Sequence, residues 1–416
     1  MASRMANTAA PGRAPFRRPA LAWVAATFVL IALGAPFLFA RLSEGLIIAD
    51  TTNRVPWGLW VVAYTWFSGL AGGLFLISSL WYLFRIRRFA SVARLSLVGS
   101  LVFLAVSMVL IGLDLGALGN AAGAILHFRW SSALSWEIKL YLAFLIIVGI
   151  QLLLVLKGDP SCETRRANRN FAIRVLAGLG VALSFVGPPS GTGMLFAAVK
   201  ARDFWSDGAT VVLFYAAAVV TAASFLLVAS VVLARIRREA PDSETTKGLA
   251  CVLLSSMAVS AFATYFQLTP SLLPAESSSG QAAQIILTGS FAPLFWIGAV
   301  GIGCVFSAAL AVAALRSGSG VCAAAAGACA LIGVFALRYA FVTVGFLVPL
   351  LPGLPAASYA PNIAEIGVVA FASGLALGLF GLSLRLLDPD SVRVRRSEAA
   401  ATVSEMRRDA GEGALK

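Results

Sequence analysis

Long apolar runs separated by short polar loops make up most of this 416-residue chain. An apolar helix of roughly 20 residues is long enough to cross the hydrocarbon core of a bilayer, which is about 30 Å thick. The runs therefore predict an all-α fold, a polytopic transmembrane helical bundle with about ten transmembrane helices. The predicted spans lie near residues 20–40, 57–84, 95–118, 134–156, 170–187, 209–234, 249–267, 285–315, 321–349 and 362–387.

Basic residues are distributed unevenly between the two sides of this predicted bundle. Of the 32 Lys and Arg residues, most fall in the N-terminal segment, in every second loop and in the C-terminal segment. Cytoplasmic loops of membrane proteins carry the excess of Lys and Arg, so both termini are predicted to be cytoplasmic. The opposite, outer side receives Arg41, Arg54, Arg129, Lys139, Lys200 and Arg202.

Three segments follow from this topology. Residues 1–19 are expected to form a basic cytoplasmic tail, residues 20–387 the ten-helix membrane domain, and residues 388–416 a cytoplasmic tail whose composition is typical of disorder. The first apolar run follows a basic stretch, as the core of a signal peptide does. It is longer than such a core and no clean A-x-A site follows it, so we expect an uncleaved helix.

The composition narrows the class of protein further. Hydrophobic residues make up 59% of the chain and charged residues only 12%, whereas soluble proteins carry about 25% charged residues. The net charge of +13 lies in short loops between apolar runs, so it is a topology signal and no nucleic-acid partner is expected. The five cysteines include no CxxC pair, so neither disulfides nor a metal site is indicated.

Ionisable residues gather near the predicted outer side. Asp114 closes the third predicted helix, His127 lies in the loop that follows, and Glu137 opens the fourth helix. A buried charge within a transmembrane helix costs about 2.5–3.5 kcal/mol on insertion scales, so Asp114 and the deep Arg338 call for a partner or a function. Asp114 and Glu137 are the candidate catalytic pair, because a buried carboxyl group can accept a proton from a hydroxyl.

Each of these residues also has a plainer interpretation. Arg129 and Lys139 are at helix ends, where long side chains reach up to the headgroups. Tyr64 and Trp57 lie where aromatic residues commonly anchor a helix in the membrane interface. The small residues of SGLAGG, 68–73, are expected to permit close helix packing.

The single histidine limits the redox chemistry of the chain. A membrane-embedded b-type haem takes two axial ligands, usually histidines, and His127 is alone and in a predicted loop. We expect no haem and no metal in this chain. If the chain takes part in redox chemistry, its mobile partner in the bilayer is a quinone, and the electrons pass through another subunit.

Seven stretches of the sequence occur in the order typical of one family. They are PWGLWVVAYTWFSGLAGG (56–73), LIGLDLG (110–116), the segment from His127 to the SWE of 135–137, SGTGMLFAAVKARDFW (190–205), FAPLFWIGAVGIG (291–303), ALRYAFVTVGF (336–346) and YAPNIAEIG (359–367). In this order the chain resembles the NrfD/PsrC family, the membrane subunits of polysulfide reductase-like oxidoreductases, and within it the ten-helix type.

The resemblance implies a haem-free quinone site near the outer face, using menaquinone or ubiquinone as substrate. It implies a partner as well, an extracytoplasmic four-cluster iron–sulfur subunit, often with a molybdopterin catalytic subunit, at the bacterial cytoplasmic (inner) membrane. Asp114, Glu137, Arg338 and Glu365 match the acids and the arginine of the family. The candidate quinone-binding residues are Tyr64, His127, Trp57, Thr192, Arg338 and Glu365. Relatives carry Tyr or His where this chain has Gly191 or Pro188, which leaves one hydrogen bond to the quinone unassigned.

A secondary transporter is the alternative. Such proteins also have about ten helices, but they place their sites near the midplane, often at broken helices. Here the deep polar residues lie mostly toward one face, although Pro188, Pro189 and Gly191 do break the fifth helix. We therefore predict a quinone-interacting membrane subunit of a multisubunit respiratory oxidoreductase, without a prosthetic group of its own; whether the chain itself counts as an enzyme stays open.

Overall fold

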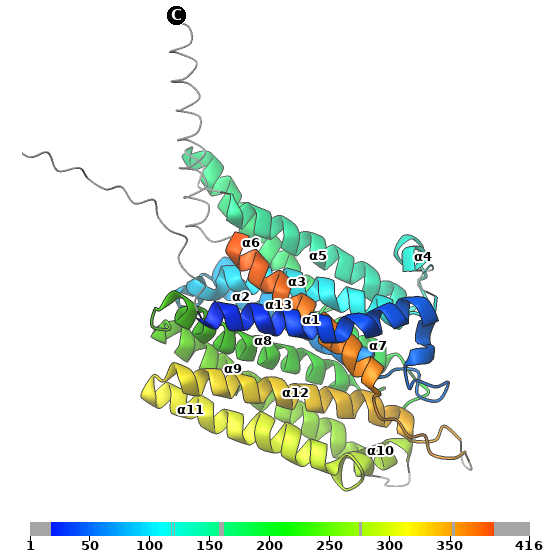
Figure 1. Ribbon diagram of the computed structural model, residues 1–416. Coiled ribbons are helices and arrows are strands. Elements are labelled where there is room, and N and C mark those ends of the chain that lie inside the picture. Colours follow the sequence, from blue (N-terminus) through cyan, green and yellow to red (C-terminus); the bar gives the residue numbers. More distant parts are fainter. Residues whose placement is uncertain are drawn as a thin grey trace, which may run out of the picture.

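Long helices run side by side along most of the chain in the computed structural model (Figure 1). The structure describes residues 18–117, 119, 121–157, 162–273, 277–351 and 354–386. Within these ranges all regular secondary structure is helical, which confirms the predicted all-α fold. Apart from two residues of the first, the predicted tails 1–19 and 388–416 lie outside the described residues.

The long helices form the bundle and the short ones connect them. The long segments are α1 (Arg18–Glu44), α2 (Leu59–Tyr82), α3 (Ala90–Asp114), α5 (Ala133–Leu156), α6 (Glu163–Ser184), α8 (Gly208–Arg237), α9 (Ser243–Leu268), η5 (Leu294–Phe306) continuing into α11 (Ser307–Ser317), α12 (Gly320–Leu347) and α13 (Ile363–Leu386). The short helices are η1 (Gly45–Ile48), η2 (Arg87–Phe89), α4 (Ala121–Leu126), α7 (Ser190–Ala197), η4 (Pro270–Leu272) and α10 (Ser278–Leu287).

Nine helices of the described chain are long and apolar enough to cross a membrane, where about ten were predicted. The segment that does not qualify is α6, which carries Glu163, Arg165, Arg166, Arg169 and Arg174 within its first twelve residues. These charges lower its hydropathy, but α6 still packs against α2 and α5. The chain is a multi-pass membrane protein with the predicted helical-bundle architecture.

The predicted span 285–315 is divided in the structure. α10 is a separate short helix, and the spanning helix begins only at Leu294. Its first part, η5, is a π-helix, a rare geometry that appears mostly as single turns inside α-helices. Gly303 of η5 meets Gly333 of α12 at a distance that no side chain would allow.

Side-chain caps fix the beginnings of several helices. Ser, Thr, Asp and Asn favour this position because their side-chain oxygen accepts a hydrogen bond from a free backbone N–H of the first turn. The capping residues are Ser132 (α5), Asp207 (α8), Asp242 (α9), Ser277 (α10) and Ser319 (α12).

The central helix is α2, which is buried along nearly its whole length. A Cβ atom on Gly72 would lie 2.7 Å from the carbonyl group of Pro188, and one on Gly73 would collide with Ala218 of α8. The predicted role of the small residues in this helix, close helix packing, is confirmed.

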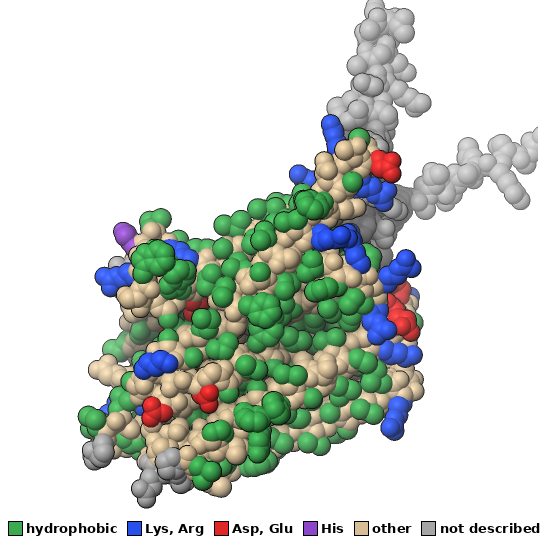
Figure 2. All heavy atoms as spheres, turned by 180° about the vertical axis from the view of Figure 1, so that it is seen from behind, with side chains coloured by type: hydrophobic (Ala, Val, Ile, Leu, Met, Phe, Trp, Pro, Cys, Tyr) green, Lys and Arg blue, Asp and Glu red, His purple; other side chains and the backbone are tan. Residues whose placement is uncertain are grey.

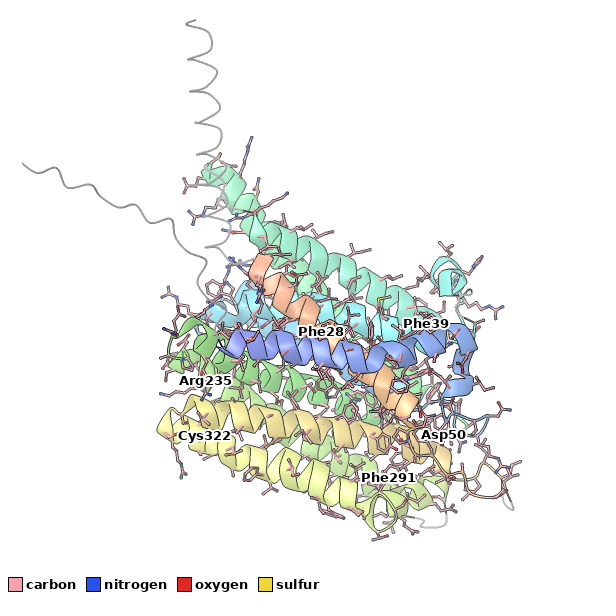
Figure 3. The ribbon with its side chains drawn as sticks, in the orientation of Figure 1. Phe28, Phe39, Asp50, Arg235, Phe291 and Cys322 are labelled. Carbon is pink, nitrogen blue, oxygen red and sulfur yellow. The ribbon has the colours of Figure 1, made fainter. Side chains whose placement is uncertain are left out.

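The two ends of the bundle differ in charge. The basic segments 85–94 and 235–247, each of which joins two long helices, meet at one end, where the Thr245 hydroxyl donates to the carbonyl of Arg88 at 2.7 Å. Arg235 lies at this end and Asp50 at the other (Figure 3). We call these the basic end and the opposite end. Figure 2 shows a broad hydrophobic surface between the two ends on one face of the bundle. On the opposite face, Phe28 and Phe39 of α1 are exposed (Figure 3).

Candidate functional site

Five buried polar side chains meet inside the bundle, toward the opposite end. They come from three helices and form what we call the central polar cluster: Tyr64 and Ser68 of α2, Glu137 and Tyr141 of α5, and Thr192 of α7. Residues four apart lie on the same face of an α-helix, so each pair on α2 and α5 points inward together.

Every member of the central polar cluster takes part in a hydrogen bond with another member. The Tyr64 hydroxyl lies 3.3 Å from both carboxylate oxygens of Glu137, to which it donates. The hydroxyl of Thr192 lies 2.7 Å from that of Tyr141 and 3.2 Å from that of Ser68. Glu137 is only 3% exposed. Burial of a carboxyl group is tolerated when hydrogen bonds replace those to water, which these hydroxyls do.

Arg338 of α12 brings a buried positive charge to the same region. Its guanidinium lies within electrostatic reach of the Tyr64 and Tyr141 hydroxyls. Its Nη2 donates to the carbonyl of Phe214 at 3.0 Å, and its Cζ lies 3.4 Å from the centroid of the Phe214 ring. Its Nε and Nη1 are buried and have no hydrogen-bond partner within the described chain. An arginine offers five N–H donors, so several remain free to bind an acceptor.

The guanidinium of Arg338 lies beside Gly69 of α2. A Cβ atom on Gly69 would lie 3.8 Å from Nη2 of Arg338 and 3.7 Å from the Cβ of Ala218. These are ordinary contact distances, so the guanidinium lies against α2 at the residue that follows Ser68 of the central polar cluster. A buried cation at this depth of a membrane protein is expected to mark a functional site.

A break between two helices places Thr192 in the cluster. α6 ends at Ser184, and the next helix, α7, begins at Ser190, just after Pro188 and Pro189. Proline lacks the N–H that a continuous helix needs, so the helix is interrupted here. The short α7 then directs its buried hydroxyl toward α2 and α5.

Glu365, a predicted quinone-binding residue, is engaged by its own helix end. Its backbone N–H donates to Oδ1 of Asn362 at 2.9 Å, and its Oε2 accepts from the N–H of Asn362 at 3.1 Å. This reciprocal pattern is a capping box. Its Oε1 accepts from the Tyr359 hydroxyl at 2.8 Å, and that hydroxyl accepts from the N–H of Leu59 at 2.7 Å. Glu365 therefore joins the beginnings of α13 and α2.

Tyr359 is held in its neutral form by these surroundings. Burial raises its pKa far above the ordinary value of a tyrosine, and the hydrogen bond to Glu365 acts in the same direction. A neutral phenol keeps its proton for Glu365 across the physiological pH range, so this contact is a stable structural element.

Asp114 lies near both Glu365 and the central polar cluster. It is partly buried at the end of α3, within electrostatic reach of Arg41, Glu365 and Tyr64. Arg41 itself is buried and donates to the carbonyls of Leu113 and Leu115, at 2.8 and 2.7 Å. The end of α3 is therefore held by a cation from α1, which also lies within electrostatic reach of the Asp114 carboxyl group.

Two further candidates lie outside the cluster. His127 is exposed, its Nδ1 lies 3.1 Å from the carbonyl of Gly123, and it lines a cavity of about 220 Å³ with Leu134 and Ile138. The structure separates it from the central polar cluster. Trp57 packs in an aromatic group, 5.2 Å from Phe196 and 5.8 Å from Trp205 between ring centroids.

Two members of the cluster and one buried cation were not among the candidates. Tyr141 and Ser68 follow Glu137 and Tyr64 by four residues, and this helical spacing was the signal that could have found them. The third residue, Arg41, is predicted from the sequence only as a charge that flanks a helix on the outer side. The outer side has few cations, and this scarcity was the signal that could have indicated a specific role for Arg41.

The fold and this site define an integral membrane protein of the helical-bundle class with a buried polar site near one end. The chain matches the family described as "Polysulphide reductase, NrfD" over residues 48–349. It belongs to that family, as the order of its motifs predicted.

Three relatives resemble the chain. It is 23% identical to a selenate reductase subunit of Mesobacillus selenatarsenatis, over 87% of this chain and 92% of the relative. It is 26% identical to the Hdr-like menaquinol oxidoreductase integral membrane subunit of Archaeoglobus fulgidus, over 57% and 58%. It is 24% identical to a putative dimethyl sulfoxide reductase membrane subunit of Halobacterium salinarum, over 52% and 54%. All three names describe oxidoreductase subunits, in agreement with the predicted class and not with the alternative of a transporter.

Proposed function

We propose that this chain is the quinone-interacting membrane subunit of a multisubunit respiratory oxidoreductase, and that the quinone ring reacts at the central polar cluster. The observation that carries the proposal is the buried Arg338, which keeps free N–H donors and lies within electrostatic reach of Tyr64 and Tyr141. A quinone presents two carbonyl oxygens, which accept hydrogen bonds, and a quinol presents two hydroxyls, which donate them. Arg338 can donate to a ring oxygen, and Glu137 can exchange a proton with one.

Oxidation of a quinol releases two electrons and two protons, and reduction of a quinone takes up the same number. In the proposed mechanism Glu137 accepts one proton from a ring hydroxyl, while Tyr64, bonded to both carboxylate oxygens, keeps the carboxyl group oriented. Asp114, the last residue of α3, lies within electrostatic reach of Tyr64 and accepts the second proton. In the reverse direction the same groups return the protons.

The electrons pass to another subunit in this proposal. The partner is an extracytoplasmic iron–sulfur subunit with four clusters, followed by a molybdopterin catalytic subunit. The position of the cluster toward the end predicted to face outward supports a partner on that side. The names of the relatives support the assembly with a reductase and, through the Archaeoglobus relative, menaquinone as substrate. The proposed location is the bacterial cytoplasmic membrane.

The decisive experiment compares two glutamates in the assembled complex. Glu137→Gln keeps the shape of the side chain but cannot accept a proton, so quinol-linked electron transfer should fall by about 10²-fold or more. Glu163→Gln, at the exposed beginning of α6, is the matched control and should retain wild-type turnover. An assembled Glu137→Gln complex that turns over at the wild-type rate would contradict the proposed site.

The partner is tested separately by purification of the tagged chain from its native membrane. Iron and molybdopterin should co-purify in constant ratio with the chain, and electron paramagnetic resonance should resolve iron–sulfur signals. Purification of the chain without iron, from membranes that retain quinone-linked activity, would contradict the proposed partner.

A further inference from the structure

An open groove faces the bilayer on one side of the bundle. It has a volume of about 420 Å³ and lies between the α6–α7 break, α8 and α9. Its wall is mostly apolar, with Phe185, Val212 and Val259 at least half exposed. We call it the α8–α9 groove. A volume of this size is within the range of ligand pockets, roughly 300–1,000 Å³.

The α8–α9 groove is separated from the central polar cluster by one short segment of chain. Ser190 lines the groove and is 2% exposed, and Thr192 of the cluster follows it on α7. Between them, a Cβ on Gly191 would lie 3.8 Å from the ring of Tyr141. The segment 185–192 thus has the groove on one side and the cluster on the other.

Two stacked rings stand where the groove meets this segment. The rings of Phe185 and Tyr215 are 5.3 Å apart with an interplanar angle of 9°. The Tyr215 hydroxyl lies 3.5 Å from that of Ser184, at the last residue of α6. Ser255 and Ser256 of α9 also line the groove, but their hydroxyls donate to the carbonyl of Val252 in their own helix. The rest of the α8 and α9 wall is apolar except for Tyr215, whose hydroxyl lies on the side toward α6 and α7.

This order of surfaces matches one kind of molecule. A respiratory quinone has a polar ring at one end and a long isoprenoid tail at the other, so its tail fits the apolar wall and its ring the polar side. A second cavity, of about 310 Å³, lies between α9, η5 and α12, but no residue of α2, α5 or α7 lines it. The α8–α9 groove alone of these two adjoins a helix that supplies a hydroxyl to the cluster.

We infer that the α8–α9 groove holds the isoprenoid tail of the quinone while its ring reaches the central polar cluster past the segment 185–192. The inference rests on the proposed function, since it assigns the rest of the same substrate to the surface beside the same site. The hydroxyls of the cluster bond to one another in this structure, so admission of the ring requires the short α7 segment to move relative to α5.

Bulky substitutions in the groove test the inference. Val212→Trp and Ser255→Trp each place a large ring in the groove from an exposed position on α8 or α9. Ile146→Trp is the matched control, because Ile146 is 61% exposed on α5 and does not line the groove. Each variant is assembled in the complete complex and assayed with two donors: a long-tail menaquinol in proteoliposomes, and menadiol, which has the same ring without the tail.

With the groove filled, KM for the long-tail menaquinol should rise by about tenfold, equivalent to about 1.4 kcal/mol. KM for menadiol and kcat with both donors should stay within twofold of the wild type, and the control should change neither. Equal responses to the two donors, or no response to either, would overturn the inference. Failure of the wild-type complex to oxidise either quinol would overturn the proposed function instead.

Labelling gives an independent readout. A menaquinone that carries a photoreactive group on its tail should label peptides covering 211–219 and 252–259, and excess unlabelled menaquinone should prevent it. Val212→Trp should reduce the labelling severalfold. Labelling confined to peptides outside the groove would overturn the inference even if the kinetic results agreed with it.

Discussion

The Tyr64 hydroxyl of α2 donates to both oxygens of Glu137 on α5, at 3.3 Å each. The two residues are 73 positions apart in the chain, and both are nearly inaccessible to solvent. A donor shared equally between two carboxylate oxygens fixes the plane of the carboxyl group without occupying either oxygen completely. Such a carboxyl group is oriented but still able to accept a further hydrogen bond from a substrate.

Tyr64→Phe removes this orientation and leaves the acid in place. We expect kcat to fall by roughly tenfold, which corresponds to about 1.4 kcal/mol, while KM stays within twofold, because Tyr64 positions Glu137 and is not needed to hold the ring. The measurement is steady-state quinol oxidation by the assembled complex. Tyr141→Phe is the comparison, since that hydroxyl bonds to Thr192. A change confined to KM would show that Tyr64 binds the substrate directly.

Arg338 should instead control binding. In Arg338→Lys the charge remains, but the planar fork of donors is lost, and lysine does not reproduce it. We expect KM to rise by about tenfold with a smaller change in kcat. Arg54→Lys, at an exposed outer position, is the control and should behave as the wild type. Arg338→Lys with an unchanged KM would remove the main support for placing the ring at the cluster.

Glu365 should affect stability rather than turnover. Glu365→Ala removes the carboxylate of the capping box and leaves the Tyr359 hydroxyl without its acceptor, at an expected loss of about 1–3 kcal/mol. The thermal midpoint of the purified complex should fall, while turnover per assembled complex remains. Glu239→Ala, at an exposed loop position, supplies the control. If the variant is as stable as the wild type but inactive, Glu365 acts in the reaction after all.

His127 should be dispensable for turnover. It is exposed in the loop after α4, and its ring bonds to the carbonyl of Gly123. The cavity that it lines is on a different side of α5 from Glu137. His127→Gln can still bond to this carbonyl, so we expect wild-type kcat and KM for quinol. Loss of activity with a normal KM, together with loss of the iron–sulfur partner on purification, would instead place His127 in the contact with that subunit.

The sequence predicted the helices well because each span must be apolar for about 20 residues, a local property. It also placed Glu137, Tyr64, Thr192 and Arg338 among the candidates, and the structure brings these four together. What it could not supply were contacts between distant segments.

Glu365 illustrates this limit, because its carboxylate is engaged by Asn362 and Tyr359, and only geometry distinguishes a capping box from a substrate ligand. The division of α6 from α7 had a clear signal in Pro188 and Pro189, but its consequence, a hydroxyl from α7 in the cluster, required the fold. The π-helix of η5 had no signal that we can identify in the sequence.

Gln151 of α5 lies where a proton path from the basic end to the central polar cluster would pass. It is fully buried, both polar atoms of its amide lack a hydrogen-bond partner within the described chain, and it lies toward the basic end. It is 14 residues beyond Glu137 on the same helix, or about 21 Å at 1.5 Å per residue. Ser100 and Ser224 also have buried hydroxyls without a partner in the described part of the chain. These isolated groups, with no carboxylate among them, do not form a continuous proton path.

We therefore predict that Gln151→Leu is neutral or stabilising and leaves turnover unchanged, because a buried amide without partners costs about 1–3 kcal/mol and leucine removes it.

Protons would then exchange at the opposite end, where the electrons also leave in the proposed assembly, and the quinone reaction would carry little net charge across the bilayer. The complex in liposomes should turn over without generating a membrane potential, as read by a potential-sensitive dye. A Gln151→Leu variant that turns over slowly, together with a potential that collapses on addition of valinomycin and potassium, would instead establish a water-filled path from the basic end to Glu137.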